Sequence, residues 1–479
     1  MTREVPFRDV DPAAVREALD RALANGGEFA EIYIEEHRAS TLTWDDGKLD
    51  RASAGHERGV GLRVVAGELN HFANGNDVSP DGLVALADRV AAGLSDPRAR
   101  RASPLELNFR SPLVPVASWP DEAPVSEQVA RLAFGDQVAR GVDSRVAQVT
   151  LSLGASRRTV FVANSDGVFA GEDIPLLVYS ATAIAREAGE LRSAHAVDSA
   201  SRGWEFLDEA LVEKLAADAA RVARLQLEAA PAPSGAMPVV LSSSAGGTMI
   251  HEACGHGLEA DFHLKRLSIY TGRLGELVAS ERVTVVDDGT LPGRRGSSQF
   301  DDEGQPTQRV VLIERGVLVG LLQSRSTSRR LDAKPTGNGR RESYRHLPAP
   351  RMRNTFIAPG EDDPEEIIAS VADGLFVAKM GGGEVDIVSG NFVFHCSEAY
   401  RIRRGRIAEP VRGATLTGNG PAVLGSIDRV GRDLGWSVGT CRKDGQGAPV
   451  SDAQPTVRIP SLVVGGSGGA SAGATRAAP

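Results

Sequence analysis

The chain of 479 residues is long enough for at least two domains, and its 41% hydrophobic and 24% charged residues are typical of a globular protein. Its net charge of −9 argues against a nucleic-acid binder, because such proteins usually carry a basic face. Three cysteines do not make a disulfide framework, and the lack of a signal-peptide-like or membrane-length apolar run predicts a cytoplasmic protein.

The first 230 residues alternate between helical and strand patterns. Asp11 suits a helix N-cap, Pro12 suits the first turn, and Gly26-Gly27 ends the helix. Further helices are expected at 79–94, 126–140 and 207–229. Strands are expected at 29–35, 40–45, 48–54, 59–65, 69–73, 146–153, 158–164 and 175–185. This order predicts an α+β domain over residues 1–230, a helix-plus-antiparallel-sheet unit built of two related halves.

A different pattern follows a linker at 231–236, where prolines and small residues show no periodicity. Residues 237–464 contain mainly short β segments and Gly-rich turns, with helices expected near 248–258, 363–372 and 422–433. The pattern predicts a β-rich C-terminal catalytic domain, sandwich or barrel-like. The Gly/Ser/Ala-rich residues 465–479 are expected to form a flexible tail.

A candidate metal site lies in Thr248-Met-Ile-His-Glu-Ala-Cys-Gly-His-Gly-Leu258. His251 and His256 can bind a metal, and Glu252 can take a proton from a bound water. Zincin histidines are four residues apart, whereas a spacing of five separates them by about 140° on an ideal helix. A bulge or unwinding at Gly255 would remove this mismatch. By spacing alone, a metal site is no better an interpretation of the two histidines than one buried and one surface side chain without a metal.

A cysteine is the best candidate for a third ligand. Cys254 lies inside the motif with awkward spacing, and Cys396 follows a strand-like run, so both are expected in the core. Cys441 lies in a Gly-flanked polar segment, which predicts a loop, and nearby Lys443 would favour its thiolate. A cysteine from a distant segment suits a His/His/Cys zinc site with one open position.

Three segments carry a resemblance to a known family. The segment 251–261 resembles the HExxxH motif of the TldD/PmbA metalloproteases, 339–355 is similar to a long TldD signature, and 437–446 resembles the family's cysteine loop. The similarity extends from the first helix to about Val464. One departure is Arg442, which stands where the family pattern has glycine.

The resemblance implies that His251, His256 and Cys441 hold Zn²⁺ and that Glu252 is the general base. It further implies a TldD-type catalytic subunit, a zinc peptidase that hydrolyses unstructured peptides within the enclosed cavity of a dimer. The implied partner is a TldE/PmbA-type paralogue without the metal, and a homodimer is the alternative. Neither a membrane nor a nucleic acid is an expected partner.

Several interpretations stay open at this point. The stretch 340–353 could steer a substrate carboxylate or stabilise an oxyanion, or its members could be ordinary ion-pair partners; it contains Tyr344, Arg345 and His346 with Arg340, Arg341, Arg351 and Arg353. Glu259, Asp261 and His263 follow the zinc motif and could orient its imidazoles or serve as caps and surface residues. The chain could also be a non-catalytic peptide-binding modulator subunit, or an amide hydrolase that tailors a peptide natural product. An intact general base disfavours the modulator, because binding alone needs no base beside a metal.

Overall fold

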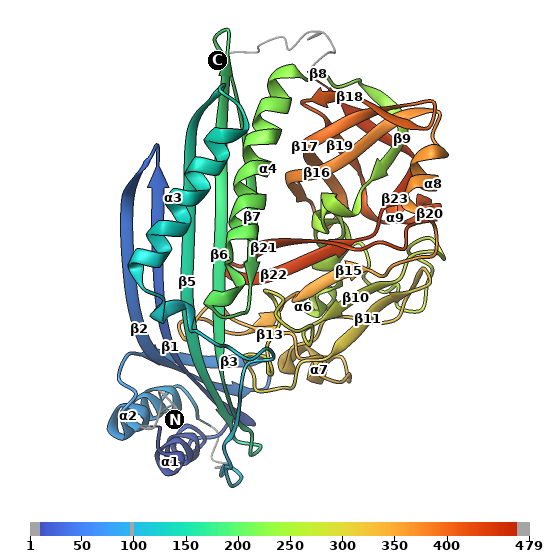
Figure 1. The fold of residues 1–479 in the computed structure, drawn as a ribbon. Helices are drawn as coiled ribbons and strands as arrows, with labels where there is room; N and C mark the ends of the chain where they lie inside the picture. Colours follow the sequence, from blue (N-terminus) through green and yellow to red (C-terminus); the bar gives the residue numbers. More distant parts are fainter. Residues whose placement is uncertain (1–9, 96–99, 467–479) are drawn as a thin grey trace, which may run out of the picture.

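The computed structural model describes residues 10–95 and 100–466. Its first part is one long, curved, mainly antiparallel sheet (Figure 1), with strand order β3-β2-β1-β5-β6-β4 and β7 beside β6. The strands are β1 Phe29–Asp45, β2 Lys48–Ala66, β3 Leu69–Gly75, β4 Asn108–Arg110, β5 Val146–Asn164, β6 Phe169–Glu187 and β7 Glu190–Ala200. Two helix pairs pack on this sheet, and the arrangement confirms the predicted α+β class.

The order helix, three strands, helix occurs twice in this part. The helices are α1 Pro12–Ala22, α2 Pro80–Ala91, α3 Val125–Val142 and α4 Glu209–Glu228, and two 3₁₀ turns are η1 Pro120–Glu122 and η2 Trp204–Phe206. Helices α1 and α2 pack together beside β1–β3, whereas α3 and α4 pack together over β5–β7. Antiparallel pairing of β1 with β5 joins the two halves into one sheet.

Several strands are longer than their sequence pattern predicts. The single strand β1 spans both expected segments, 29–35 and 40–45, although the polar residues between them interrupt the hydrophobic alternation. Glu36 pairs with Arg58 of β2 on one side and with Thr159 of β5 on the other. A ladder on both edges satisfies the backbone hydrogen bonds, so this strand continues through the polar stretch.

The second part contains a barrel. Strands β9, β16, β17, β19 and β23 pair in a closed ring, because β16 bonds both β9 and β17. The ring and its neighbours comprise β8 Ala230–Pro231, β9 Gly235–Leu241, β16 Asp373–Val385, β17 Asn391–Arg403, β18 Arg406–Arg412, β19 Thr415–Asn419, β20 Arg429–Val430 and β23 Val457–Gly465. The sequence therefore predicted the β-rich character of this part correctly.

A six-stranded sheet lies against the barrel, in the order β12-β11-β10-β15-β22-β21. Its strands are β10 Val285–Asp288, β11 Arg309–Glu314, β12 Val317–Leu318, β15 Asn354–Ile357, β21 Gly435–Lys443 and β22 Gln446–Gln454, and β13 Gly339–Arg340 pairs with β14 Ala349–Pro350 nearby. Short helices are α6 Ala260–Lys265, α7 Arg325–Arg330, α8 Pro364–Ala369 and α9 Gly420–Ser426. Helix α9 ends earlier than expected because Ile427 turns to extended backbone before β20.

Residues 339–355 connect the second part to the first sheet. Tyr344 is buried with Tyr33, Val160 and Val162 of that sheet. Gly59 and Gly61 of β2 leave space for it, since a Cβ at either position would overlap the Tyr344 residue. Arg341, only 2% exposed, pairs with buried Glu31 of β1. The two parts are therefore joined by packing and by buried charge pairs.

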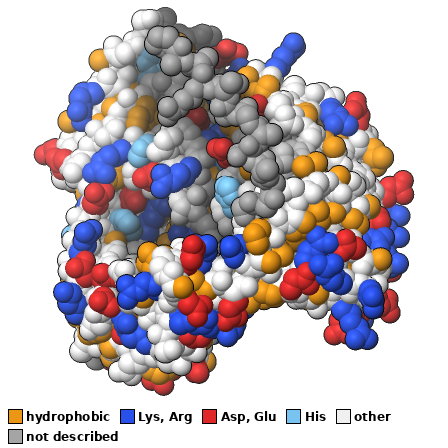
Figure 2. Space-filling model, turned by 90° about the horizontal axis from the view of Figure 1, so that it is seen from above, with side chains coloured by type: hydrophobic (Ala, Val, Ile, Leu, Met, Phe, Trp, Pro, Cys, Tyr) orange, Lys and Arg blue, Asp and Glu red, His pale blue; other side chains and the backbone are white. Residues whose placement is uncertain are grey.

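On the face in Figure 2, basic and acidic side chains are interspersed, in line with the modest net charge. Among the described residues, no helix is both long and apolar enough to cross a membrane.

Candidate metal centre

The histidine motif forms one π-turn. The chain passes from α5 (Thr248–Ile250) through η4 (His251–Gly255) to η5 (His256–Leu258). The His256 N–H donates to the His251 carbonyl, an i→i+5 bond that closes a turn wider than that of an α-helix. The five-residue spacing therefore brings both imidazoles together, with ring centroids 4.9 Å apart. The structure thus contains the bulge that the spacing requires.

Gly255 is needed for packing rather than for backbone freedom. It has a φ of −54°, which every residue adopts. A Cβ at this position would overlap the Met352 sulfur, which is fully buried beside the turn. The close approach of Met352 therefore explains the glycine, whereas the sequence argument attributed it to a relaxed backbone.

Cys441 supplies the third candidate ligand from the opposite wall. It lies on β21, the edge strand of the six-stranded sheet, and not in the loop that its glycine-flanked sequence indicates. Its Sγ is 3.7 Å from His256 Nε2. The donor atoms of His251, His256 and Cys441 all lie within 4.8 Å of one another, and the three residues are buried.

Two carboxylates orient the imidazoles. Asp452 Oδ1 is 2.8 Å from His251 Nδ1, and Glu259 Oε2 is 3.2 Å from His256 Nδ1. Each contact leaves the Nε2 atom of its ring available for a cation, as is usual for metal-binding histidines. Lys443 in turn holds Glu259 through its Nζ at 3.0 Å. Sequence reasoning included Glu259 as one of several candidates, but it missed Asp452, which is 201 residues away from His251.

The electrostatics favour a thiolate. Burial raises the pKa of Cys441, but hydrogen bonds and charge from His251 and His256 outweigh this effect and bring the pKa down to about 5. Burial lowers the pKa of His256, yet Glu259 and Cys441 raise it to about 9. The histidines, rather than Lys443, therefore stabilise the thiolate. A divalent cation replaces the protons of such a cluster when it binds.

Glu252 lies beside the three donors. It lines a cavity of about 300 Å³ together with His251, His256 and Cys441. Burial raises the pKa of Glu252, although the neighbouring imidazoles oppose this change. Its carboxyl group is thus placed to exchange a proton with a molecule in the cavity.

The donor set fits zinc. Two imidazole nitrogens and one thiolate are ligands that Zn²⁺ accepts in proteins, and the three residues that carry them line the cavity. Cys254 and Cys396 are in the hydrophobic core as expected, where burial raises the pKa of each thiol to about 12.

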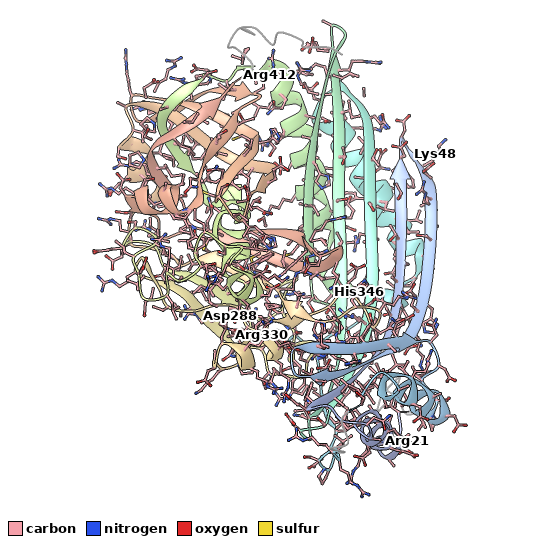
Figure 3. The ribbon with its side chains drawn as sticks, turned by 180° about the vertical axis from the view of Figure 1, so that it is seen from behind. Arg21, Lys48, Asp288, Arg330, His346 and Arg412 are labelled. Carbon is pink, nitrogen blue, oxygen red and sulfur yellow. The ribbon has the colours of Figure 1, made fainter. Side chains whose placement is uncertain are left out.

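The structure does not bring Tyr344, Arg345 or His346 to this cavity. The Tyr344 hydroxyl donates to Asn76 at 3.1 Å, and Arg345 pairs with exposed Glu57 at 2.9 Å. His346, labelled in Figure 3, contacts the Ser343 hydroxyl through Nδ1 at 3.0 Å. The contacts of Tyr344 and Arg345 place these two residues at the junction between the two parts of the molecule, whereas His346 contacts residues of its own segment.

Family models and similar known proteins point to the same family. Models described as PmbA/TldA metallopeptidase domain 1, central domain and C-terminal domain match residues 30–94, 119–227 and 234–466. A Haemophilus influenzae protein named metalloprotease TldD homolog is 38% identical, with 92% of this chain and 93% of that protein covered. A Methanothermobacter thermautotrophicus metalloprotease is 34% identical, with 92% and 96% covered.

Solved structures share the fold. TldE from Thermococcus kodakarensis superposes with a TM-score of 0.74 at 18% identity, covering 94% of this chain and 99% of that chain. A Thermotoga maritima protein whose description connects it with DNA gyrase superposes with a TM-score of 0.76 at 24% identity, covering 91% and 96%.

Proposed function

The chain belongs to the PmbA/TldD family and is a metalloprotease, and from this premise we propose that it is the catalytic, zinc-dependent subunit. The observation that carries the proposal is the convergence of His251, His256 and Cys441, whose donor atoms lie within 4.8 Å beside Glu252. A subunit that only binds peptides needs neither a third ligand from a distant strand nor a carboxylate next to it. These features favour the peptidase over a modulator.

In the proposed mechanism, His251 and His256 would hold Zn²⁺ through their Nε2 atoms and Cys441 through its Sγ. A cation held there would supply Lewis-acid activation of the peptide carbonyl and of a water molecule. Glu252 accepts the proton of the attacking water on a carboxylate oxygen and then delivers it to the departing amide nitrogen. Asp452 and Glu259 keep the two imidazoles in the tautomer that presents Nε2.

The substrate of this proposal is an unstructured peptide. The cavity of about 300 Å³ at the cluster is at the lower end of the range for ligand sites, so it suits a short extended segment and not a folded domain. We also propose an enclosed site in a dimer, with a TldE-type paralogue as partner. The fold shared with TldE supports this pairing, and a homodimer is the alternative.

The test is hydrolysis of an unfolded peptide by the metal-loaded protein and by Glu252→Gln. We expect the substitution to lower kcat by at least roughly a hundredfold, because it removes the proton acceptor, while zinc content is unchanged. Chelation should abolish hydrolysis by the wild-type protein, and added Zn²⁺ should restore it. Full activity of Glu252→Gln would refute the mechanism, and a zinc-free protein that hydrolyses peptides would refute the role of the metal.

A further inference from the structure

A second cavity, of about 510 Å³, lies next to strand β21. Its walls come from the long strands of the first sheet, the segment 295–298 and the β21–β22 hairpin, which extends toward that sheet in Figure 1. Thr440 and Arg442 line both this cavity and the one at the metal cluster. The two cavities therefore adjoin each other along β21.

Of the five arginines that line this cavity, only Arg158 forms an ion pair with a carboxylate within the described part of the chain; Arg295, Arg340, Arg353 and Arg442 do not. Arg340, only 8% exposed, donates to the carbonyls of Met352 at 2.6 Å and Pro449 at 2.8 Å. Half-buried Arg295 donates to the Gly439 carbonyl at 3.0 Å and to the hydroxyls of Ser199 and Thr440. All these acceptors are neutral, so they satisfy hydrogen bonds without neutralising the charge.

The acidic groups of the same walls are engaged elsewhere. Glu35 pairs with Arg158 at 3.0 Å and accepts the Tyr344 N–H at 2.8 Å. Asp302 accepts the Arg341 N–H at 2.8 Å, and Glu342 accepts the Gly447 N–H. The lining thus carries five guanidinium groups against three carboxylates, an excess of positive charge. Burial lowers the pKa of Arg295 to about 10, and burial together with the charge of Arg353 lowers that of Arg340 to about 9. Both remain cationic at neutral pH and attract an anion into the cavity.

We propose that this cavity binds a carboxylate of the peptide substrate, with Arg295 and Arg340 as its cationic partners. The inference rests on the proposed peptidase function, because this cavity shares Thr440 and Arg442 with the cavity at the metal cluster. A carboxylate fits better than a phosphate, since Glu342 and Asp302 in the walls repel a second negative charge. The volume is within the range of about 300–1,000 Å³ for ligand sites. Arg295 and Arg340 would then be specificity residues that set which part of a peptide enters the metal site.

The test compares three fluorophore-labelled peptides of one sequence: a free C-terminal acid, its C-terminal amide, and the amide with one internal Glu. Affinity is measured by anisotropy with metal-loaded Glu252→Gln protein, so that binding is read without cleavage. We expect at least one carboxylate peptide to bind roughly tenfold more tightly than the neutral amide, as a charge-assisted contact provides. Preference for the free acid identifies the C-terminus as the ligand, and preference for the Glu peptide identifies a side chain.

Adding Arg295→Gln should remove this preference, Arg295→Lys should retain part of it, and the control Arg403→Gln should leave it intact, because exposed Arg403 pairs with Glu409 outside the cavity. Equal affinity for all three peptides would overturn the inference, even if the wild-type protein hydrolyses them. A preference that survives Arg295→Gln in full would also overturn it. Absence of hydrolysis by the wild-type protein would instead count against the peptidase proposal, while the binding comparison would still decide the role of the cavity.

Discussion

The imidazoles of His251 and His256 are each held by a carboxylate at ring nitrogen Nδ1. Glu259 is fully buried, and burial raises its pKa, but His256 and Lys443 outweigh that effect and lower the pKa to about 2. It is therefore a permanent anion at neutral pH. Such partners fix ring orientation and increase the basicity of the ligand.

Removing either carboxylate should weaken the metal site without removing a ligand. We predict that Asp452→Asn and Glu259→Gln each reduce zinc affinity by roughly 10- to 100-fold. Competition with a chromophoric chelator measures the affinity, and Asp373→Asn serves as control because that residue forms an exposed pair with Arg401. Unchanged affinity in both site variants would show that the carboxylates do not support the ligands.

At the scale of elements, the sequence identified most helices and strands but not their continuity. The caps Asp11 and Ser79 mark α1 and α2 correctly, because capping is local and each side chain accepts a nearby N–H. The length of β1 depends on two partner strands that a local pattern does not contain. The position of Cys441 on β21 depends in the same way on pairing with Ala448 of β22, so its polar, glycine-flanked sequence suggested a loop.

In the candidate site, too, some features follow from the local sequence and others depend on contacts with distant segments. His251, Glu252 and His256 were candidates from their residue types, Cys441 was a candidate from its local sequence, and the resemblance to the family supported all four. The reason for five-residue spacing became clear only from the π-turn and from Met352, which packs against Gly255. Asp452 carried no signal in the sequence, because its role depends on where β22 lies relative to the motif.

The π-turn should be sensitive to one added methyl group. We predict that Gly255→Ala lowers the free energy of unfolding by about 1–3 kcal/mol, because its Cβ overlaps Met352 Sδ. Urea denaturation measures the change. Gly55→Ala is the matched control, since a Cβ there has open space. Combining Gly255→Ala with Met352→Ala should cost less than the sum of the two single changes, and strict additivity would contradict the proposed overlap.

At the scale of the whole molecule, buried polar contacts join the first sheet to the second part. Arg63 of β2 pairs with Glu303 at 2.8 Å, and Glu172 of β6 accepts the N–H groups of Gln299 at 2.8 Å and Phe300 at 3.2 Å. Burial raises the pKa of Glu172 from its usual value of 4.5 to about 7, although the two N–H groups and Arg353 oppose this. The junction therefore contains a carboxyl group that binds its proton more tightly in the folded state.

This group makes stability depend on pH. The folded state binds the Glu172 proton more tightly than the unfolded state. Burial of Glu172 therefore costs no folding stability below about pH 4.5, where the group is protonated in both states, and its full cost is reached above about pH 7. Between these values we predict that wild-type stability falls by about 1.4 kcal/mol per pH unit relative to Glu172→Gln. Urea unfolding of both proteins from pH 5 to 7.5 measures the difference. A difference that does not change with pH would contradict the raised pKa.

The central claim is that two imidazoles and one thiolate from opposite walls bind the same cation. X-ray absorption at the zinc edge of the purified, metal-loaded protein tests it most directly. We predict one sulfur at about 2.3 Å and two imidazole nitrogens at about 2.0–2.1 Å, with the sulfur signal lost in Cys441→Ser. A first shell without sulfur, or a sulfur signal that persists in Cys441→Ser, would contradict the account.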